Sequence, residues 1–146
     1  MAKKEMKEED AASAKDMQQR YLELQLYDQQ MRQAQQQMQA VEQQTMEIEY
    51  VVQCLDEIMN VEAGTELFIP ISSGIFLKAT LVDSKEALVN VGGGTAVKKQ
   101  IPEVKELLRA QIHELRRVQE ELAAKMEEIA RRAAVIESDV RKLTGI

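Results

Sequence analysis

The region that decides the fold is Glu66–Lys99, which has the sequence ELFIPISSGIFLKATLVDSKEALVNVGGGTAVKK. Four short runs of strand-forming residues alternate in it with turn residues. The first two runs are joined by Ser72-Ser73-Gly74, and the last two by Gly92-Gly93-Gly94. Glycine supplies the positive φ angles that tight hairpin turns need. The sequence therefore predicts two β-hairpins within residues 64–100.

Both faces of the first predicted hairpin carry apolar side chains. Leu67 and Ile69 alternate with Phe68 along one strand, and Phe76 lies on the same face as Phe68. Two hairpins with strands of about five residues are too small to bury both faces alone. We therefore expect other chains to complete this insert. The residues predicted to serve subunit assembly are Leu67, Phe68, Ile69, Pro70, Gly74, Phe76, Val89, Val91, Gly92, Gly94 and Val97.

On either side of the insert, the sequence predicts long helices. Residues 17–63 carry a heptad seam, and residues 101–146 carry a second apolar row. Neither Asp16–Glu62 nor the segment after Pro102 as far as Leu143 contains Gly or Pro. The first seam consists of Leu24, Tyr27, Met31, Ala34, Met38, Val41, Thr45, Ile48, Val52, Leu55 and Met59, and the second row of Leu108, Leu115, Leu122, Ile129, Ile136 and Leu143.

Two helices of similar length that are joined by a compact insert pair most simply as antiparallel neighbours. Leu24 would then lie opposite roughly Val140. The expected fold class is α+β: a long antiparallel coiled-coil hairpin with two β-hairpins inserted between its helices. Residues 1–16 are rich in charge and lack apolar periodicity, so we expect them to form a flexible tail.

Some apolar residues lie outside these seams. Near the insert, five such residues are expected to pack against the β-hairpins: Tyr50, Val51, Cys54, Ile58 and Val61. Near the free end of the helices, no other element of the chain is left to cover such residues, which makes an interaction surface plausible. Ragged packing at a helix end and contacts between copies are the alternatives. The residues at this end are Met17, Tyr21, Leu22, Leu26, Val135, Val140, Leu143 and Ile146.

Composition excludes several classes of function. The net charge of −6 over 146 residues argues against a binder of nucleic acid or anionic membranes. One cysteine and one histidine cannot form a disulfide or a metal site, so no metal and no cofactor are expected. The predicted architecture offers no concave site, which argues against an enzyme. The charged N-terminus predicts no signal segment, and we expect a cytoplasmic protein.

Two motifs in the insert resemble the alpha subunit of archaeal prefoldin. The first is a Pro-x-x-x-Gly-x-Phe-x-Lys-Ala run, and the second is a Val-x-Val-Gly-x-Gly-x-x-Val run before a Lys. These correspond here to Pro70, Gly74, Phe76, Lys78 and Ala79, and to Val89, Val91, Gly92, Gly94, Val97 and Lys98. Ser72-Ser73 departs from the pattern, because a glycine is expected earlier in the first turn.

This resemblance implies a function and a set of partners. It implies a hexamer of two alpha and four prefoldin beta subunits, in which the hairpins form a double β-barrel. It also implies an ATP-independent chaperone, a holdase that captures unfolded proteins with the coiled-coil tips and delivers them to a group II chaperonin. The residues near the free end, named above, would then bind the client. The alternative is a structural coiled-coil scaffold or tether subunit with a dedicated partner.

Overall fold

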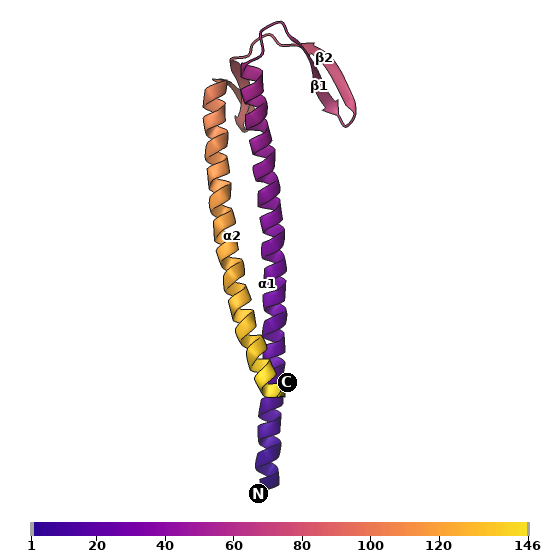
Figure 1. The fold of residues 1–146 in the computed structure, drawn as a ribbon, viewed down its shortest axis with the longest axis vertical. Coiled ribbons are helices and arrows are strands. Elements are labelled where there is room, and N and C mark those ends of the chain that lie inside the picture. The colour runs from indigo at the N-terminus through magenta and orange to yellow at the C-terminus, as the bar shows by residue number, and fades with distance from the viewer. Residues whose placement is uncertain (1, 146) are drawn as a thin grey trace. The chain divides into compact units, whose positions relative to one another are not determined.

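The structure is a computed structural model that describes the backbone of residues 2–145 and the side chains of residue 8 and residues 13–145. Its elements follow the order helix, two hairpins, helix (Figure 1). They are α1 (Ala2–Met59), β1 (Glu66–Ser72), β2 (Ile75–Thr80), β3 (Glu86–Gly92), β4 (Thr95–Gln100) and α2 (Ile101–Thr144). The chain divides into a terminal unit, residues 1–42 and 117–146, and a central unit, residues 43–116.

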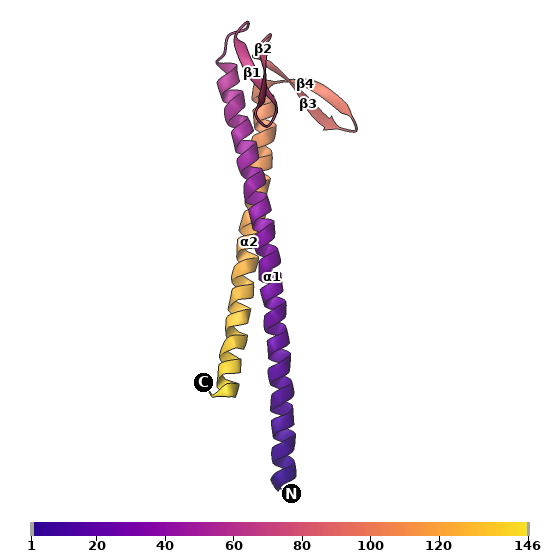
Figure 2. The same cartoon turned by 90° about the vertical axis from the view of Figure 1, so that its right-hand side faces the viewer.

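In the terminal unit, α1 and α2 run side by side in opposite directions (Figures 1 and 2). The side chains buried between them are Ala34 of α1 and Leu122, Ile129 and Ile136 of α2. All four belong to the heptad rows, where the 3-4 spacing keeps one stripe of each helix facing its partner. The core of this unit is therefore the seam that the sequence predicts.

In the central unit, the two helices are joined by the same kind of seam. Ile101, Val104 and Ile112 of α2 are buried, as is Thr45 of α1. Ion pairs cross the seam from Asp56 to Lys105, and from Glu49 Oε1 to the Arg116 guanidinium at 3.0 Å.

The N-terminal stretch differs from the prediction. Helix α1 begins at Ala2 and not near Met17, so the helix includes most of the stretch expected to be a tail. Lys, Glu, Met and Ala dominate this stretch, and all four have high intrinsic helix propensity. Without Gly or Pro to end it, the helix continues although no apolar periodicity supports it. The flexibility expected for residues 1–16 stays a prediction.

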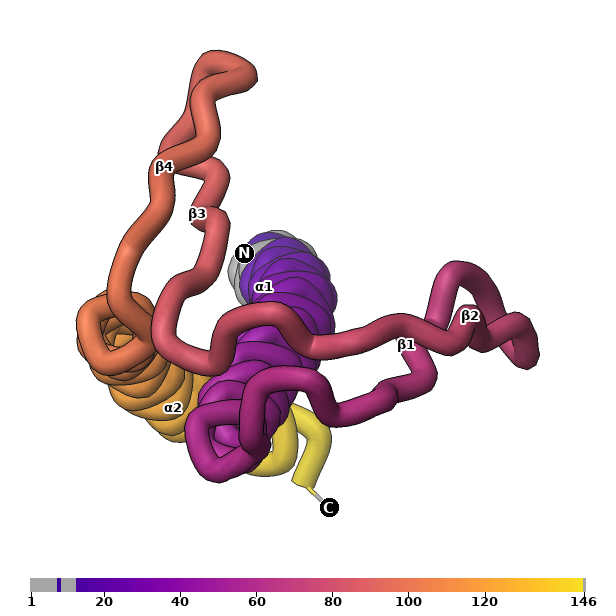
Figure 3. Tube along the Cα trace, turned by 90° about the horizontal axis from the view of Figure 1, so that it is seen from above, coloured from indigo at the N-terminus to yellow at the C-terminus, as the bar shows by residue number. Residues whose placement is uncertain are grey.

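The insert forms two separate antiparallel hairpins, β1–β2 and β3–β4, drawn as separate loops in Figure 3. Each turn has two residues rather than three, because Ser72 pairs with Ile75 and Gly92 pairs with Thr95. Gly93 and Gly94 both have positive φ, as a type I′ turn requires. In the first turn only Gly74 does, so a serine is compatible with position 73.

The structure confirms the predicted fold class, two long helices with two small β-hairpins between them. One expectation about packing is wrong for two of its five residues. Of the residues expected to lie against the β insert, Tyr50 and Val51 are exposed, whereas Cys54, Ile58 and Val61 are half-buried. The strands are short and pair only within their own hairpin. They therefore do not form a sheet wide enough to cover Tyr50 and Val51.

Candidate protein-interaction surfaces

The first hairpin exposes apolar side chains on both of its faces. Leu67 pairs with Ala79 and Ile69 with Leu77, which places these four residues on one face. Phe68 pairs with Lys78 on the opposite face. The Phe68 side chain is 71% exposed, and Ile69 and Leu77 are exposed as well. A two-sided apolar ribbon of this kind is typical of a sheet that is completed by other strands.

The second hairpin has the same character. Val89 pairs with Val97 on one face, and Leu88 and Val91 are exposed. The predicted assembly residues of the two hairpins thus lie on β1–β4 and in their turns. Leu88, which the sequence analysis did not single out, is also exposed there. Its alternation with Ala87 and Val89 could have indicated it.

The residues predicted near the free end all belong to the terminal unit. Tyr21, Leu22, Leu26, Val135 and Leu143 are exposed, whereas Met17 and Val140 are half-buried. Ile146 lies outside the described residues. The arrangement therefore separates the predicted set into five accessible side chains and two that contribute more to helix packing.

Leu22 and Leu26 form a patch on the outer face of α1. They are one helical turn apart, and each lies roughly opposite the seam residue Leu24 around the helix. Leu22 is 59% exposed and Leu26 is 52% exposed. Because neither faces α2, changing them should leave the helix pair intact.

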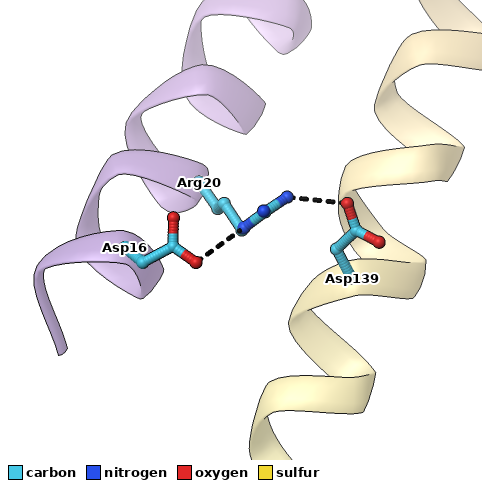
Figure 4. A network of polar contacts seen from close by, with 3 residues as sticks. All are labelled: Asp16, Arg20 and Asp139. Atoms are coloured by element: carbon cyan, nitrogen blue, oxygen red, sulfur yellow. Dashed lines mark hydrogen bonds and ion pairs between the residues drawn. The ribbon is translucent and has the colours of Figure 1, made fainter. Parts of the chain in front are cut away.

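A polar cluster joins the two helices in the same part of the terminal unit (Figure 4). The Arg20 guanidinium donates to Asp139 of α2 at 2.7 Å and to Asp16 of α1 at 3.4 Å. Partial desolvation lowers the pKa of Arg20, but the two carboxylates outweigh it and raise this pKa above its ordinary value. Arg20 falls where the apolar spacing of the seam is interrupted, so an ion pair replaces an apolar contact at that position.

Removal of this ion pair should have a small effect. We expect Asp139→Asn to lower the urea midpoint of unfolding only slightly, because partly exposed ion pairs contribute little and are screened by salt. The difference from the wild type should shrink further in 1 M NaCl. A large, salt-independent loss would contradict this interpretation.

An open groove of about 410 Å³ lies between α1 and α2 in the terminal unit. Leu24, Met31 and Ile129 line it together with Tyr21. Asp28 and Glu137 also line it, and both are exposed. The periodicity of the sequence does not predict this groove. Tyr21 and Asp28 are seven residues apart and lie beside the seam, so their spacing could have indicated that both lie along the same edge of the helix pair. The width of the groove depends on how the two helices pair, which this spacing does not determine.

Tyr27 and Arg132 make a further link between the helices of this unit. The Glu128 carboxylate, which accepts from Arg132 at 2.9 Å, and the Tyr27 hydroxyl raise the pKa of Arg132. In the central unit, a hydrogen bond with the Cys54 side chain raises the pKa of Tyr50, and desolvation and the Glu57 carboxylate raise it further. Both effects arise from side chains next to the shifted group.

The described part of the chain shows neither a metal site nor a membrane-spanning helix. Among the described side chains, no three His, Cys, Asp or Glu groups are placed so that they could hold a metal ion. No helix within the described residues combines the length and the apolar character needed to span a membrane.

Comparison with known proteins points to one family. A family model described as prefoldin subunit matches residues 27–145. Prefoldin subunit alpha 1 of Methanocaldococcus jannaschii is 30% identical over 128 residues, which cover 88% of this chain and 87% of that protein. Prefoldin subunit alpha of Methanococcus aeolicus is 26% identical over 127 residues, covering 87% and 86%.

A solved structure has the same fold. The filamentous PFD from Methanocaldococcus jannaschii, determined by cryo-EM, superposes with a TM-score of 0.70. The match covers 78% of this chain and 94% of that one, at 12% identity.

Proposed function

Because this chain belongs to the prefoldin family and is a prefoldin chaperone subunit, we propose that it captures unfolded polypeptides with the exposed apolar side chains of its terminal unit. Prefoldin subunits form oligomeric complexes with other prefoldin subunits. We propose a hexamer of two such chains with four prefoldin beta subunits, acting without ATP in the cytoplasm and delivering clients to a group II chaperonin.

The observation that carries this proposal is the exposure of Leu22 and Leu26 beside a well-packed seam. Both are more than half exposed, on a helix face where nothing else in the described chain covers them. Full burial of a Leu side chain is worth at most about 1.5–3 kcal/mol. One such patch therefore binds weakly, so retention of a client requires the helix pairs of several subunits in the complex to bind it together.

Weak and non-directional contact suits this task. Apolar burial requires no particular hydrogen-bond pattern, so many unfolded sequences can satisfy it. Weak individual contacts also permit release. The exposed hairpin faces support the other half of the proposal, because they offer strand edges and apolar surface for partner subunits.

The test is a Leu22→Ser, Leu26→Ser double variant assembled with its beta subunits. We expect weaker suppression of aggregation for several unrelated clients, with helicity and complex mass unchanged. The matched control is Met46→Ser, Tyr50→Ser, which has the same spacing on α1, and both of its residues are 68% exposed. This control should protect clients as well as the wild type does.

Undiminished protection by the Leu22, Leu26 variant would remove this patch as the client site. Equal loss in the control pair would show that any apolar surface along α1 serves. If the wild-type complex fails to protect any client, the holdase function itself is wrong, and the scaffold alternative gains support.

A further inference from the structure

The groove in the terminal unit combines apolar side chains with carboxylates, whereas the patch of Leu22 and Leu26 is purely apolar. The apolar lining of the groove, which we call its floor, consists of the half-buried Leu24 and Met31 of α1 and the buried Ile129 of α2, and Tyr21 lines the groove as well. Tyr21 is 51% exposed, so its ring is available to an incoming group. A volume of about 410 Å³ is within the range of about 300–1,000 Å³ that ligand pockets have.

Two exposed carboxylates line the groove, and we call them its rim. Asp28 and Glu137 contribute carboxylates from the two helices. Asp28 is paired with Arg32 at 2.9 Å, whereas Glu137 has no ion-pair partner among the residues whose side chains are described. Glu137 is also exposed. A carboxylate beside an apolar floor favours a ligand that carries a cation next to an apolar group.

We propose that this groove binds client segments in which a large apolar side chain is adjacent to a Lys or Arg. The apolar side chain lies on the floor beside Leu24, Met31 and Ile129, and the cation lies at the rim beside Glu137. This proposal rests on the holdase function above and adds a preference to it: basic apolar segments are favoured over acidic apolar ones.

The preference for basic segments should be small, because it depends on an exposed charge pair. An exposed charge pair is worth little and is screened by salt. The cation therefore biases the choice between segments, while the apolar contact supplies most of the affinity. We expect the preference to be roughly two- to fivefold in dissociation constant at low salt, and to disappear at high ionic strength.

The experiment uses the complete complex and three fluorescent, unstructured peptides. The peptides share the same leucines and differ only in the neighbouring residues, which are Lys, Gln or Glu. Anisotropy titrations should give the tightest binding for the Lys peptide and the weakest for the Glu peptide. Glu137→Gln should abolish the difference, and Glu137→Lys should reverse it.

The matched control is Glu127→Lys, which makes the same change in charge on α2 at an exposed position that does not line the groove. It should keep the wild-type order of the three peptides. The proposal is overturned if the wild-type complex does not prefer the Lys peptide, or if Glu127→Lys and Glu137→Lys change the order equally.

A second measurement locates the contact. A photo-crosslinking phenylalanine analogue at position 21 should label the Lys peptide more than the Glu peptide, and an analogue at position 135 should label both equally. Val135 is exposed but does not line the groove. If the complex protects clients but shows neither preference, only the groove proposal fails; if it protects none, the holdase function fails first.

Discussion

Replacing Phe68 and Phe76 together by glutamate should prevent this chain from assembling with its partner subunits while its helices remain folded. The two rings are 71% and 58% exposed in the single chain, so the change costs the isolated hairpin little. In the complex, two buried aromatic side chains would be lost, each worth about 1.5–3 kcal/mol. The loss of this burial alone should raise the dissociation constant of the complex by about a hundredfold or more. Burial of the two new charges would add to this loss.

The measurement is the mass of the complex formed with a co-expressed beta subunit, together with the helical circular dichroism signal. A matched control is Leu22→Glu, Leu26→Glu, which also exchanges two exposed apolar residues for two charges but lies outside the hairpins. The control should reach the full mass. A full-mass complex from the Phe68, Phe76 variant would show that this face of the hairpin stays outside the subunit interface.

Truncation of the seam should have the largest effect on stability. Ile129 is 5% exposed and packs in the core of the terminal unit. Ile129→Ala removes several buried carbons and leaves a cavity, and such changes cost about 2–5 kcal/mol. We expect a clearly lower midpoint in denaturant unfolding followed by circular dichroism.

Val135→Ala is the control for this measurement, because Val135 lies on the same helix and is 61% exposed. Its unfolding free energy should change by less than about 0.5 kcal/mol, as is usual for surface positions. If the two variants unfold alike, Ile129 is not a core residue.

Local rules account for most of what the sequence predicted correctly. The 3-4 spacing from Leu24 to Met59 predicts a helix seam because an α-helix returns to the same face every 3.6 residues. The glycines after Val91 predict a hairpin because few other residues accept positive φ. The alternation of Leu67, Phe68 and Ile69 predicts a two-sided strand, and the register of β1 with β2 agrees.

The two differences from the predictions have different physical causes. Helix α1 extends to Ala2 because the high helix propensity of Lys, Glu, Met and Ala acts even where the sequence has no apolar periodicity. Tyr50 and Val51 remain exposed because packing against the hairpins would need a broader sheet than two separate two-stranded ribbons provide.

The sequence by itself determined the two seams, the two hairpins and the outward position of Leu22 and Leu26, since each depends on the geometry of a single element. Only the tertiary structure decided that Arg20 reaches Asp139, and that Tyr21, Ile129 and Glu137 line one groove. These groups belong to different helices, and the register of one helix against the other sets which side chains meet. Periodicity establishes which face of a helix is buried, but the contacts across the seam arise from the packing of both helices together.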